Sequence, residues 1–213
     1  MCCRYYMEAS PELRPFVEAA KRSSLGEKMV AKLARPLMTA GEVRPTNLVP
    51  VLATSRSRGV SVFPMIWGFS GFSSPLVNAR SESAGTKPAF RDSWKSHRCV
   101  IPASWYCEWE HIPLPNGKTK TGDKYMIQPR GRNITYLAGL YRIETREGFS
   151  FPSFVILTRA PGGELRRIHD RMPVILPDSL IRKWVNPEAD PASVLGLALT
   201  DMMIEKAGND RRQ

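Results

Sequence analysis

The chain has 213 residues, 42% of them hydrophobic, which is enough to bury a core without disulfides or a structural metal. Its 31 Lys and Arg against 20 Asp and Glu give a net charge of +11, which fits a polyanionic partner, either nucleic acid or an anionic membrane surface. No apolar run approaches the roughly 20 residues that span a bilayer, and the N-terminal residues are too polar for a signal peptide. We therefore expect a cytoplasmic protein with no membrane partner.

Helical signals come first along the chain. Ser10-Pro11-Glu12 has the N-cap serine and early proline of a helix start, and apolar residues follow at helical spacing up to Ala20. The basic stretch over residues 21–36 predicts a loop and a short helix.

The middle of the chain predicts strands separated by turns. Apolar stretches rich in β-branched and aromatic residues place these strands over residues 47–53, 61–69, 98–112, 124–129, 134–143 and 153–160. Residues 98–112 form one or two strands, and Asn116-Gly117 after them is a strong signal for a hairpin turn.

The tail of the chain returns to helical signals. Asp178 precedes a predicted helix over residues 179–185, and Asp190-Pro191 has the N-cap and first-turn proline of a helix over residues 192–199. Strands in the middle and helices at the ends predict a single α+β domain with a mainly antiparallel, barrel-like sheet and flanking helices.

Four cysteines lie in the chain, at positions 2, 3, 99 and 107. In a reducing compartment we expect free thiols rather than a disulfide framework. Neither the adjacent pair nor the later pair has the spacing of a zinc site, so no metal is predicted. The sequence has no glycine-rich phosphate loop, and we expect no cofactor.

Five short stretches carry side chains suited to chemistry: "MCCR" at 1–4, "PMIWGF" at 64–69, "VNARSES" at 77–83, "WYCEWE" at 105–110 and "RIHDRMPVIL" at 167–176. Taken singly, each has a plain structural interpretation. Arg80 could pair with Glu82, Glu108 could be solvated at the surface, and Asp170 could hold His169. Taken together, they supply the groups of a covalent-catalysis site for an anionic substrate.

Three of these residues favour that chemistry by their own properties. If Met1 is removed, Cys2 carries both a free thiol and a free α-amine. Glu108 is flanked by Trp105, Tyr106 and Trp109, an apolar setting that raises the pKa of a buried carboxyl. His169 is of the residue type that titrates near neutral pH.

The five stretches resemble the motifs of the SRAP family and follow them in the same order along the chain. These SOS-response-associated peptidase proteins process abasic sites in single-stranded DNA. The matching segments are "MCCR", "WGF", "NARSE", "CEWE" and "IHDRMP". The resemblance runs from Met1 to about residue 205, and it implies the SRAP fold in one domain over residues 1–213 with a short tail at 206–213. It also implies single-stranded DNA containing abasic sites as the partner, a monomer, and association with the nucleoid.

The resemblance implies catalytic roles for Cys2, Asn78, Glu108 and His169. Once Met1 is removed, the α-amine of Cys2 attacks the open-ring aldehyde of the lesion, and its thiol then closes a thiazolidine ring. Asn78 contacts the sugar, Glu108 acts as acid and base beside the Cys2 amine, and His169 helps to open the sugar ring. Removal of Met1 by the protein's own site and a lyase side activity are also implied.

The resemblance further implies a DNA-binding set. Arg4 and Arg80 match phosphate-holding arginines, a role that suits a bidentate guanidinium. Trp67 and Phe69 match an aromatic segment that stacks on or wedges between bases. Thr158 matches a threonine at the wall of the pocket.

The sequence departs from the family pattern at two positions. Cys3 stands where the family has glycine, so a side chain is expected to crowd the backbone near the lesion. Glu42 stands where many members have an asparagine, which puts that DNA-backbone contact in doubt.

Two other functions remain open from the sequence. One is a non-catalytic module that binds undamaged single-stranded DNA reversibly through the same basic and aromatic residues. The other is a cysteine peptidase with Cys2 or Cys107 as the nucleophile and His169 as the base.

Overall fold

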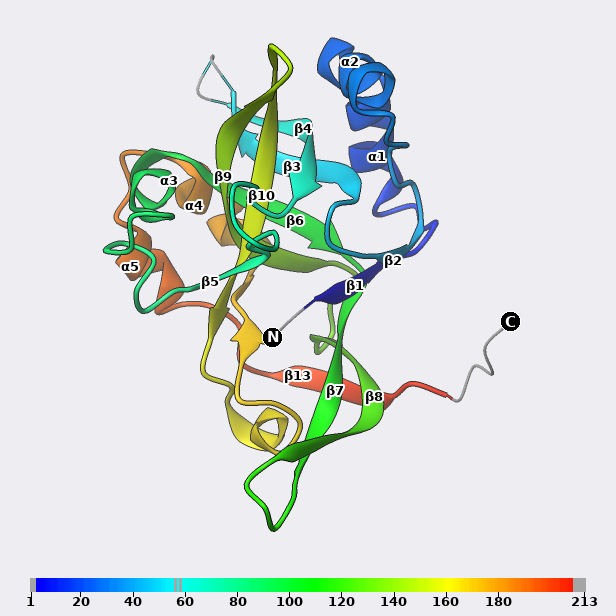
Figure 1. The fold of residues 1–213 in the computed structure, drawn as a ribbon, viewed down its shortest axis with the longest axis vertical. Helices are drawn as coiled ribbons and strands as arrows, with labels where there is room; N and C mark the ends of the chain where they lie inside the picture. Colours follow the sequence, from blue (N-terminus) through cyan, green and yellow to red (C-terminus); the bar gives the residue numbers. More distant parts are fainter. Residues whose placement is uncertain (1–2, 56, 58, 209–213) are drawn as a thin grey trace.

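The computed structural model describes residues 3–55, 57 and 59–208, and its centre is a closed five-stranded barrel (Figure 1). The barrel strands are β3 (Leu48–Thr54), β4 (Val60–Trp67), β6 (Arg98–Ala103), β9 (Thr135–Arg146) and β10 (Phe149–Arg159). Their order is β10-β4-β3-β6-β9, and β9 pairs again with β10 to close the ring. Only the β10–β4 pairing within this ring is parallel.

Three short strands extend the barrel wall next to the site. They are β5 (Asn78–Arg80), β11 (Met172–Pro173) and β12 (Ile175–Leu176). β5 lies parallel to β10, while β11 and β12 lie antiparallel to β10 and β9.

A second, antiparallel sheet lies below the barrel in Figure 1 and has the order β13-β8-β7-β1-β2. Its strands are β1 (Arg4–Met7), β2 (Gly41–Val43), β7 (Trp105–Pro113), β8 (Thr119–Pro129) and β13 (Met202–Lys206). β1 from the start of the chain is therefore held between β2 and β7, which brings the N-terminal motif to the "WYCEWE" strand.

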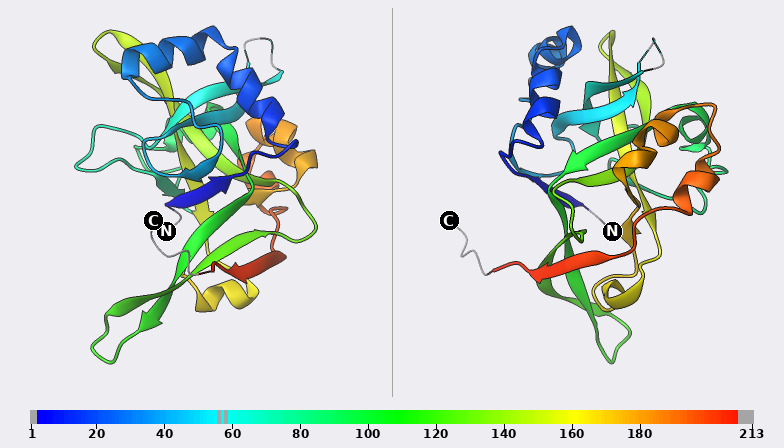
Figure 2. Two further views of the ribbon diagram at one scale, coloured as in Figure 1. Left: turned by 90° about the vertical axis from the view of Figure 1, so that its right-hand side faces the viewer. Right: turned by 180° about the vertical axis from the view of Figure 1, so that it is seen from behind.

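Helices cover two sides of the molecule (Figures 1 and 2). They are α1 (Arg14–Lys21), α2 (Ser24–Leu33), α3 (Arg91–Ser96), α4 (Ile181–Val185) and α5 (Pro191–Leu195), with 3-10 turns η1 (Gly163–Arg167) and η2 (Asp178–Leu180). α1 contacts β3 and β4, and α4 contacts β6. No helix in the described ranges has the length and apolar character needed to cross a membrane.

The two sheets share one hydrophobic core. Tyr5 and Tyr106 from the second sheet pack with Trp67, Phe154 and Ile156 from the barrel, and all five are at most 1% exposed. This shared core fixes the second sheet against the barrel mouth, so residues from both can form one site.

The structure confirms the predicted α+β barrel, and the long strands fall where the sequence places them, except that β8 begins at Thr119, ahead of the predicted strand over residues 124–129. It corrects two details near the ends. The first helix begins at Arg14 rather than near Pro11, because residues 11–13 form turns in which the Ser10 hydroxyl accepts the Leu13 N–H. The helical tail ends in a strand, since β13 pairs with β8.

Candidate active site

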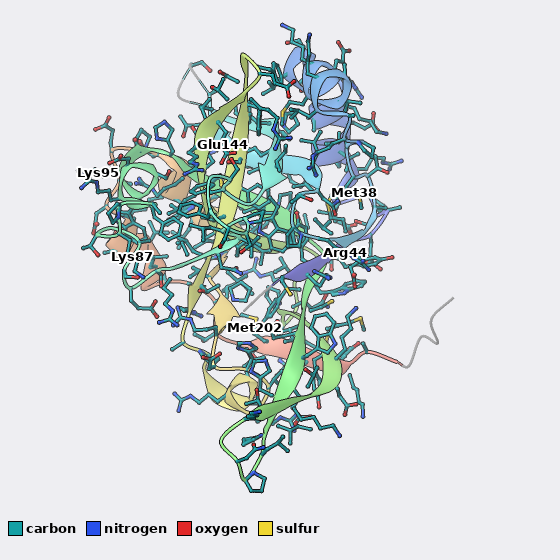
Figure 3. The ribbon with its side chains drawn as sticks, in the orientation of Figure 1. Met38, Arg44, Lys87, Lys95, Glu144 and Met202 are labelled. Atoms are coloured by element: carbon teal, nitrogen blue, oxygen red, sulfur yellow. The ribbon has the colours of Figure 1, made fainter. Side chains whose placement is uncertain are left out.

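The centre of the candidate site is a buried carboxyl beside a buried imidazole. Figure 3 shows the side chains of the described residues. Glu108 on β7 is 3% exposed and His169, just after η1, is 6% exposed. His169 Nε2 lies 3.5 Å from Glu108 Oε1. Burial raises the pKa of Glu108 to about 7, and burial is also the main cause that lowers the pKa of His169 to about 4.

These pKa values decide what kind of contact the two residues make. Near neutral pH the imidazole is neutral and the carboxyl is close to half protonated, so the contact is not an ion pair between two full charges. A carboxyl that gains and loses a proton near pH 7 is suited to general acid–base chemistry. The interpretation of Glu108 as a solvated surface residue is therefore wrong.

The other nitrogen of His169 is held by its own loop. Its Nδ1 accepts a hydrogen bond from the Arg171 backbone N–H at 3.0 Å and lies 2.6 Å from Asp170 Oδ1. An Nδ1 that accepts from Arg171 leaves the ring proton on Nε2, which faces Glu108. In the other tautomer the Nδ1 proton would be donated to Asp170, and Nε2 would accept a hydrogen bond from a protonated Glu108.

Arg171 ties this loop to the "NARSE" segment. Its guanidinium donates two hydrogen bonds to Glu82, at 2.9 and 2.8 Å, and a third to the Thr158 carbonyl at 2.7 Å. Glu82 therefore pairs with Arg171 rather than with Arg80. This bidentate pair was not predicted, although both residues lie within the quoted motifs.

The register of the sheets brings the remaining motifs to the same place. β5 runs beside β10 with Asn78 opposite Ile156 and Arg80 opposite Thr158. In the second sheet Arg4 is opposite Cys107, the residue that precedes Glu108 on β7. Cys2, the predicted nucleophile, lies outside the described residues, and Cys3 is a half-buried free thiol.

Arg4 and Glu42 meet on this sheet. Arg4 Nε lies 3.4 Å from Glu42 Oε1, and Glu42 also forms ion pairs with Arg44 and Lys124 at 2.9 and 2.8 Å. The hydrogen bonds and positive charges of Lys124 and Arg44 outweigh partial burial, so the pKa of Glu42 is lowered and the side chain carries its charge. At the position where the sequence departs from an asparagine expected in many members, this chain therefore has an anion among three cations.

Two predicted base-stacking residues are core residues in this structure. Trp67 and Phe69 are both 0% exposed. The Trp67 indole donates to the Val77 carbonyl and packs between Tyr5 and Phe154. Neither ring presents an exposed face on which a base could stack. In this structure Trp67 and Phe69 form part of the core behind β5.

The exposed aromatic of this region is Phe72, which is 47% exposed in the loop between Phe69 and Leu76. The glycine- and serine-rich stretch "SGFSSP" around it is a signal for an exposed loop. Phe72 was not among the predicted residues, because the family pattern points to the preceding "WGF".

The other two predicted DNA-binding residues differ in access. Arg80 is exposed at the end of β5. Thr158 is 0% exposed, and its hydroxyl faces the Ala79 carbonyl at 3.5 Å. It lies opposite Arg80 on the neighbouring strand, and its hydroxyl also accepts a long hydrogen bond from the Arg171 guanidinium at 3.4 Å.

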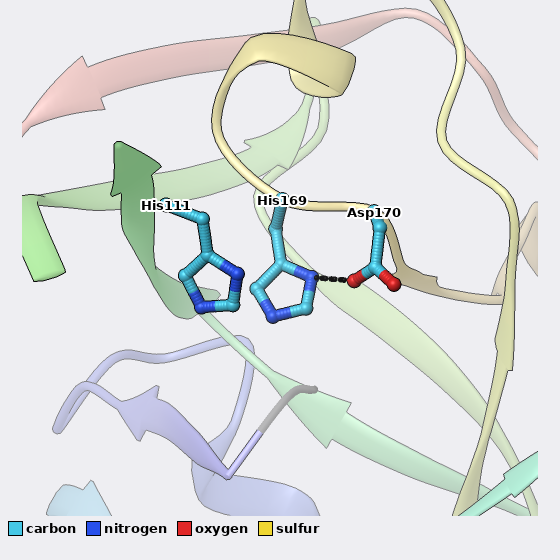
Figure 4. Close-up of side chains that lie close together, drawn as sticks. All are labelled: His111, His169 and Asp170. Atoms are coloured by element: carbon cyan, nitrogen blue, oxygen red, sulfur yellow. Dashed lines mark ion pairs between the residues drawn. The ribbon is translucent and has the colours of Figure 1, made fainter. Parts of the chain in front are cut away.

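Three residues of this site offer ligand atoms that lie within 4.8 Å of one another: His111, His169 and Asp170 (Figure 4). A metal ion needs a free lone pair on each imidazole. Both nitrogens of His169 are already engaged, with Glu108 on one side and with Asp170 and Arg171 on the other. The arrangement therefore favours a hydrogen-bonded cluster over a metal centre.

Cys107 is not suited to be a nucleophile. It is 2% exposed, and burial raises the pKa of its thiol to about 11. A buried, protonated thiol is unreactive. This argues against the peptidase alternative that uses Cys107.

The fold and the site define a class of protein: a closed barrel joined to an antiparallel sheet, with an acid–imidazole pair buried beside the N-terminal strand. The family model described as "SOS response associated peptidase (SRAP)" matches residues 1–207. The chain belongs to the SRAP family.

Known proteins agree with this assignment in sequence and in fold. "Abasic site processing protein YoqW" of Bacillus subtilis is 38% identical over 118 residues, which are 54% of this chain and 50% of that protein. "Abasic site processing protein YedK" of Escherichia coli is 29% identical over 145 residues, which are 65% of this chain and 61% of that protein. The chain thus aligns with about half to three-fifths of these relatives.

Two crystal structures show the same fold at low sequence identity. A protein from Bacteroides thetaiotaomicron superposes with a TM-score of 0.73 at 22% identity, covering 98% of this chain and 93% of that one. A phage-related protein from Bordetella bronchiseptica superposes with a TM-score of 0.70 at 21% identity, covering 98% of this chain and 95% of that one.

Proposed function

We propose that this protein processes abasic sites in single-stranded DNA by forming a covalent link through Cys2 after Met1 is removed. The observation that carries the proposal is the buried Glu108–His169 pair beside the start of β1. Cys2 directly precedes Cys3 in the sequence, and Cys3 directly precedes β1. The SRAP family match and the names of the relatives support the substrate class.

The proposed chemistry begins at the amine. The neutral α-amine adds to the aldehyde carbon of the open-ring sugar, and loss of water leaves a carbon–nitrogen double bond. The thiol sulfur then adds to the same carbon while its proton passes to the nitrogen, which closes a five-membered thiazolidine ring. The second addition is intramolecular and therefore entropically favoured.

Glu108 and His169 supply the proton transfers that these steps need. With a pKa of about 7, Glu108 accepts a proton from the attacking amine and returns it to the hydroxyl that leaves as water. The neutral His169 assists proton transfer as the sugar ring opens. Arg80 on the exposed end of β5 holds a phosphate, and Asn78 on the same strand contacts the sugar.

Two secondary activities belong to this proposal. The same acid–base pair removes Met1, and it catalyses slow strand cleavage by β-elimination at the lesion. A cytosolic methionine aminopeptidase also accepts a small second residue, so the first of these is not required for linking.

The test is a denaturing gel of the purified protein mixed with single-stranded DNA that carries one abasic site. We expect a heat-stable shifted band that Cys2→Ala abolishes, while the matched variant Cys3→Ala retains it. Intact-mass measurement of each sample shows whether Met1 has been removed, and we expect the mass of the chain without Met1. A stable band with Cys2→Ala would overturn the proposal, and reversible binding without any band would favour the non-catalytic DNA-binding module.

A further inference from the structure

We propose that His111 is a positioning residue that holds the His169 imidazole against Glu108. The two imidazole rings lie 4.0 Å apart between centroids, with a 46° angle between their planes (Figure 4). The His111 backbone N–H also donates to the Ile168 carbonyl at 2.8 Å, next to His169 in the chain. A ring contact and a backbone hydrogen bond thus fix the His169 loop to β7.

An irregularity in the β7–β8 ladder places His111 for this contact. Trp109 is opposite Lys124 but His111 is opposite Thr121, so β8 has one residue more than β7 between these pairs. Gly122 lies in this bulge, where a Cβ would come within 2.9 Å of Glu110 Oε2 and of Ile112 Cδ1. A side chain at this position would have to displace these two side-chain ends, and bulges increase the local twist of a strand.

The twist explains how one strand supplies two partners to one imidazole. Glu108 and His111 are three residues apart, and strict alternation would direct their side chains to opposite faces of β7. Both nevertheless contact His169, Glu108 at 3.5 Å and His111 through its ring. His169 thus has two partners on β7 beside the bulge, the buried Glu108 and the exposed His111.

The contact also affects the protonation of His169. Among the described residues, the titratable groups that face its ring are Glu108 and His111 from β7 and Asp170 from its own loop. Burial is the main cause that lowers the pKa of His169; the electrostatic effect of His111 acts in the same direction, and Asp170 opposes both. His111 therefore helps to keep His169 neutral, the form in which it exchanges a proton with Glu108.

The first experiment follows the imidazole signals of the whole protein by NMR during a pH titration, without DNA. The chain has three histidines, and comparison of His111→Phe and His97→Phe with the parent assigns their signals. We expect the titration midpoint of His169 to move upward in His111→Phe, toward the ordinary value of 6.5. The matched control is His97→Phe, because His97 packs on Tyr141 outside the site, and we expect no change there.

The second experiment measures the rate of covalent linking to abasic single-stranded DNA across pH, and it rests on the proposed function. In His111→Phe, which keeps a ring against His169, the linking rate at neutral pH should stay close to that of the parent, because the pKa of Glu108 and not that of His169 sets the acid limb. In His111→Gln, which removes the ring, the rate should fall several-fold across the whole profile. An unchanged His169 midpoint in a folded His111→Phe protein would overturn the positioning role, whereas absence of linking in the parent would overturn only the proposed function.

Discussion

Glu108 shows how one residue of the site combines function with a cost in stability. Its carboxyl is 3% exposed, and burial raises its pKa from an ordinary 4.5 to about 7. The unfolded chain therefore ionises at lower pH than the folded protein. As pH rises from about 4.5 to 7, folding becomes progressively less favourable at this residue.

This sign leads to a prediction for Glu108→Gln. The substitution removes the ionisable group and with it this loss of stability at high pH. The change in the free energy of unfolding caused by the substitution should therefore be more favourable at about pH 8 than at about pH 4.5, by about 3 kcal/mol. Urea denaturation of parent and variant at both pH values measures this difference. The same variant should lose most of the linking rate because it cannot accept a proton. A pH-independent difference in stability would contradict the raised pKa.

Ion pairs around Glu42 and Arg171 show why single-residue roles cannot be carried over by name alone. Arg4 was predicted to hold a phosphate, and it faces Glu42 in this structure. Arg171 was given no role, and it joins three segments of the site through Glu82 and Thr158. The residue types were readable from the sequence, but their partners are decided by strand register.

At the level of elements, the closure of the barrel depends on close packing around one glycine of β9. Gly139 is opposite Cys99 on β6 and Ile156 on β10, so it lies between both neighbouring strands. A Cβ at this position would come within 2.7 Å of Ile101 Cδ1 and 2.8 Å of the Val155 carbonyl oxygen. A backbone carbonyl cannot move aside as a flexible side chain can. The β6–β9–β10 seam, where β9 lies between β6 and β10 at Gly139, therefore has no room for a methyl group.

Gly139→Ala should therefore lower the free energy of unfolding by about 2 kcal/mol, the usual cost of overpacking a core. Thermal and urea denaturation measure the loss. Gly162→Ala is the matched control, because a Cβ there meets nothing within 4 Å and its backbone conformation suits alanine. Equal stability of both variants would show that the β6–β9–β10 seam tolerates the added methyl.

A second element-level feature is the clamp on the loop that carries Phe72. Glu144 accepts hydrogen bonds from the backbone and hydroxyl of Ser70, at 2.9 and 2.6 Å, and from Ser153 at 2.8 Å. Arg142 donates to the Ser70 carbonyl and stacks over Phe69 at 4.5 Å. The base of the loop is thus fixed to β9 and β10, while Phe72 stays exposed.

For the whole molecule, the net charge of +11 predicts salt-sensitive binding to single-stranded DNA. Each phosphate contact contributes about 0.7 to the slope of log affinity against log salt for a single strand. Arg80→Ala should lower that slope by about this amount and weaken binding uniformly across sequences. Fluorescence anisotropy over a salt series measures both, with Arg146→Ala near the β9–β10 turn as the control. An unchanged slope for Arg80→Ala would remove Arg80 from the phosphate-binding set.

The sequence by itself determined the long elements and the residue types of the site. Apolar stretches rich in β-branched and aromatic residues predicted β3, β4 and β6–β10, and five ordered motifs identified Glu108, His169 and Asn78 as candidates. These signals are local, because strand propensity and motif spacing act over a few residues.

Only the tertiary structure decided which residues meet and which are buried. The short strands β1, β5 and β11 exist because neighbouring strands supply their hydrogen bonds, so no local pattern predicts them. The same long-range packing buries Trp67 and Phe69, pairs Arg171 with Glu82, and brings His111 against His169 across a bulge. Barrel closure and strand register set these contacts, and both depend on residues far apart in the chain.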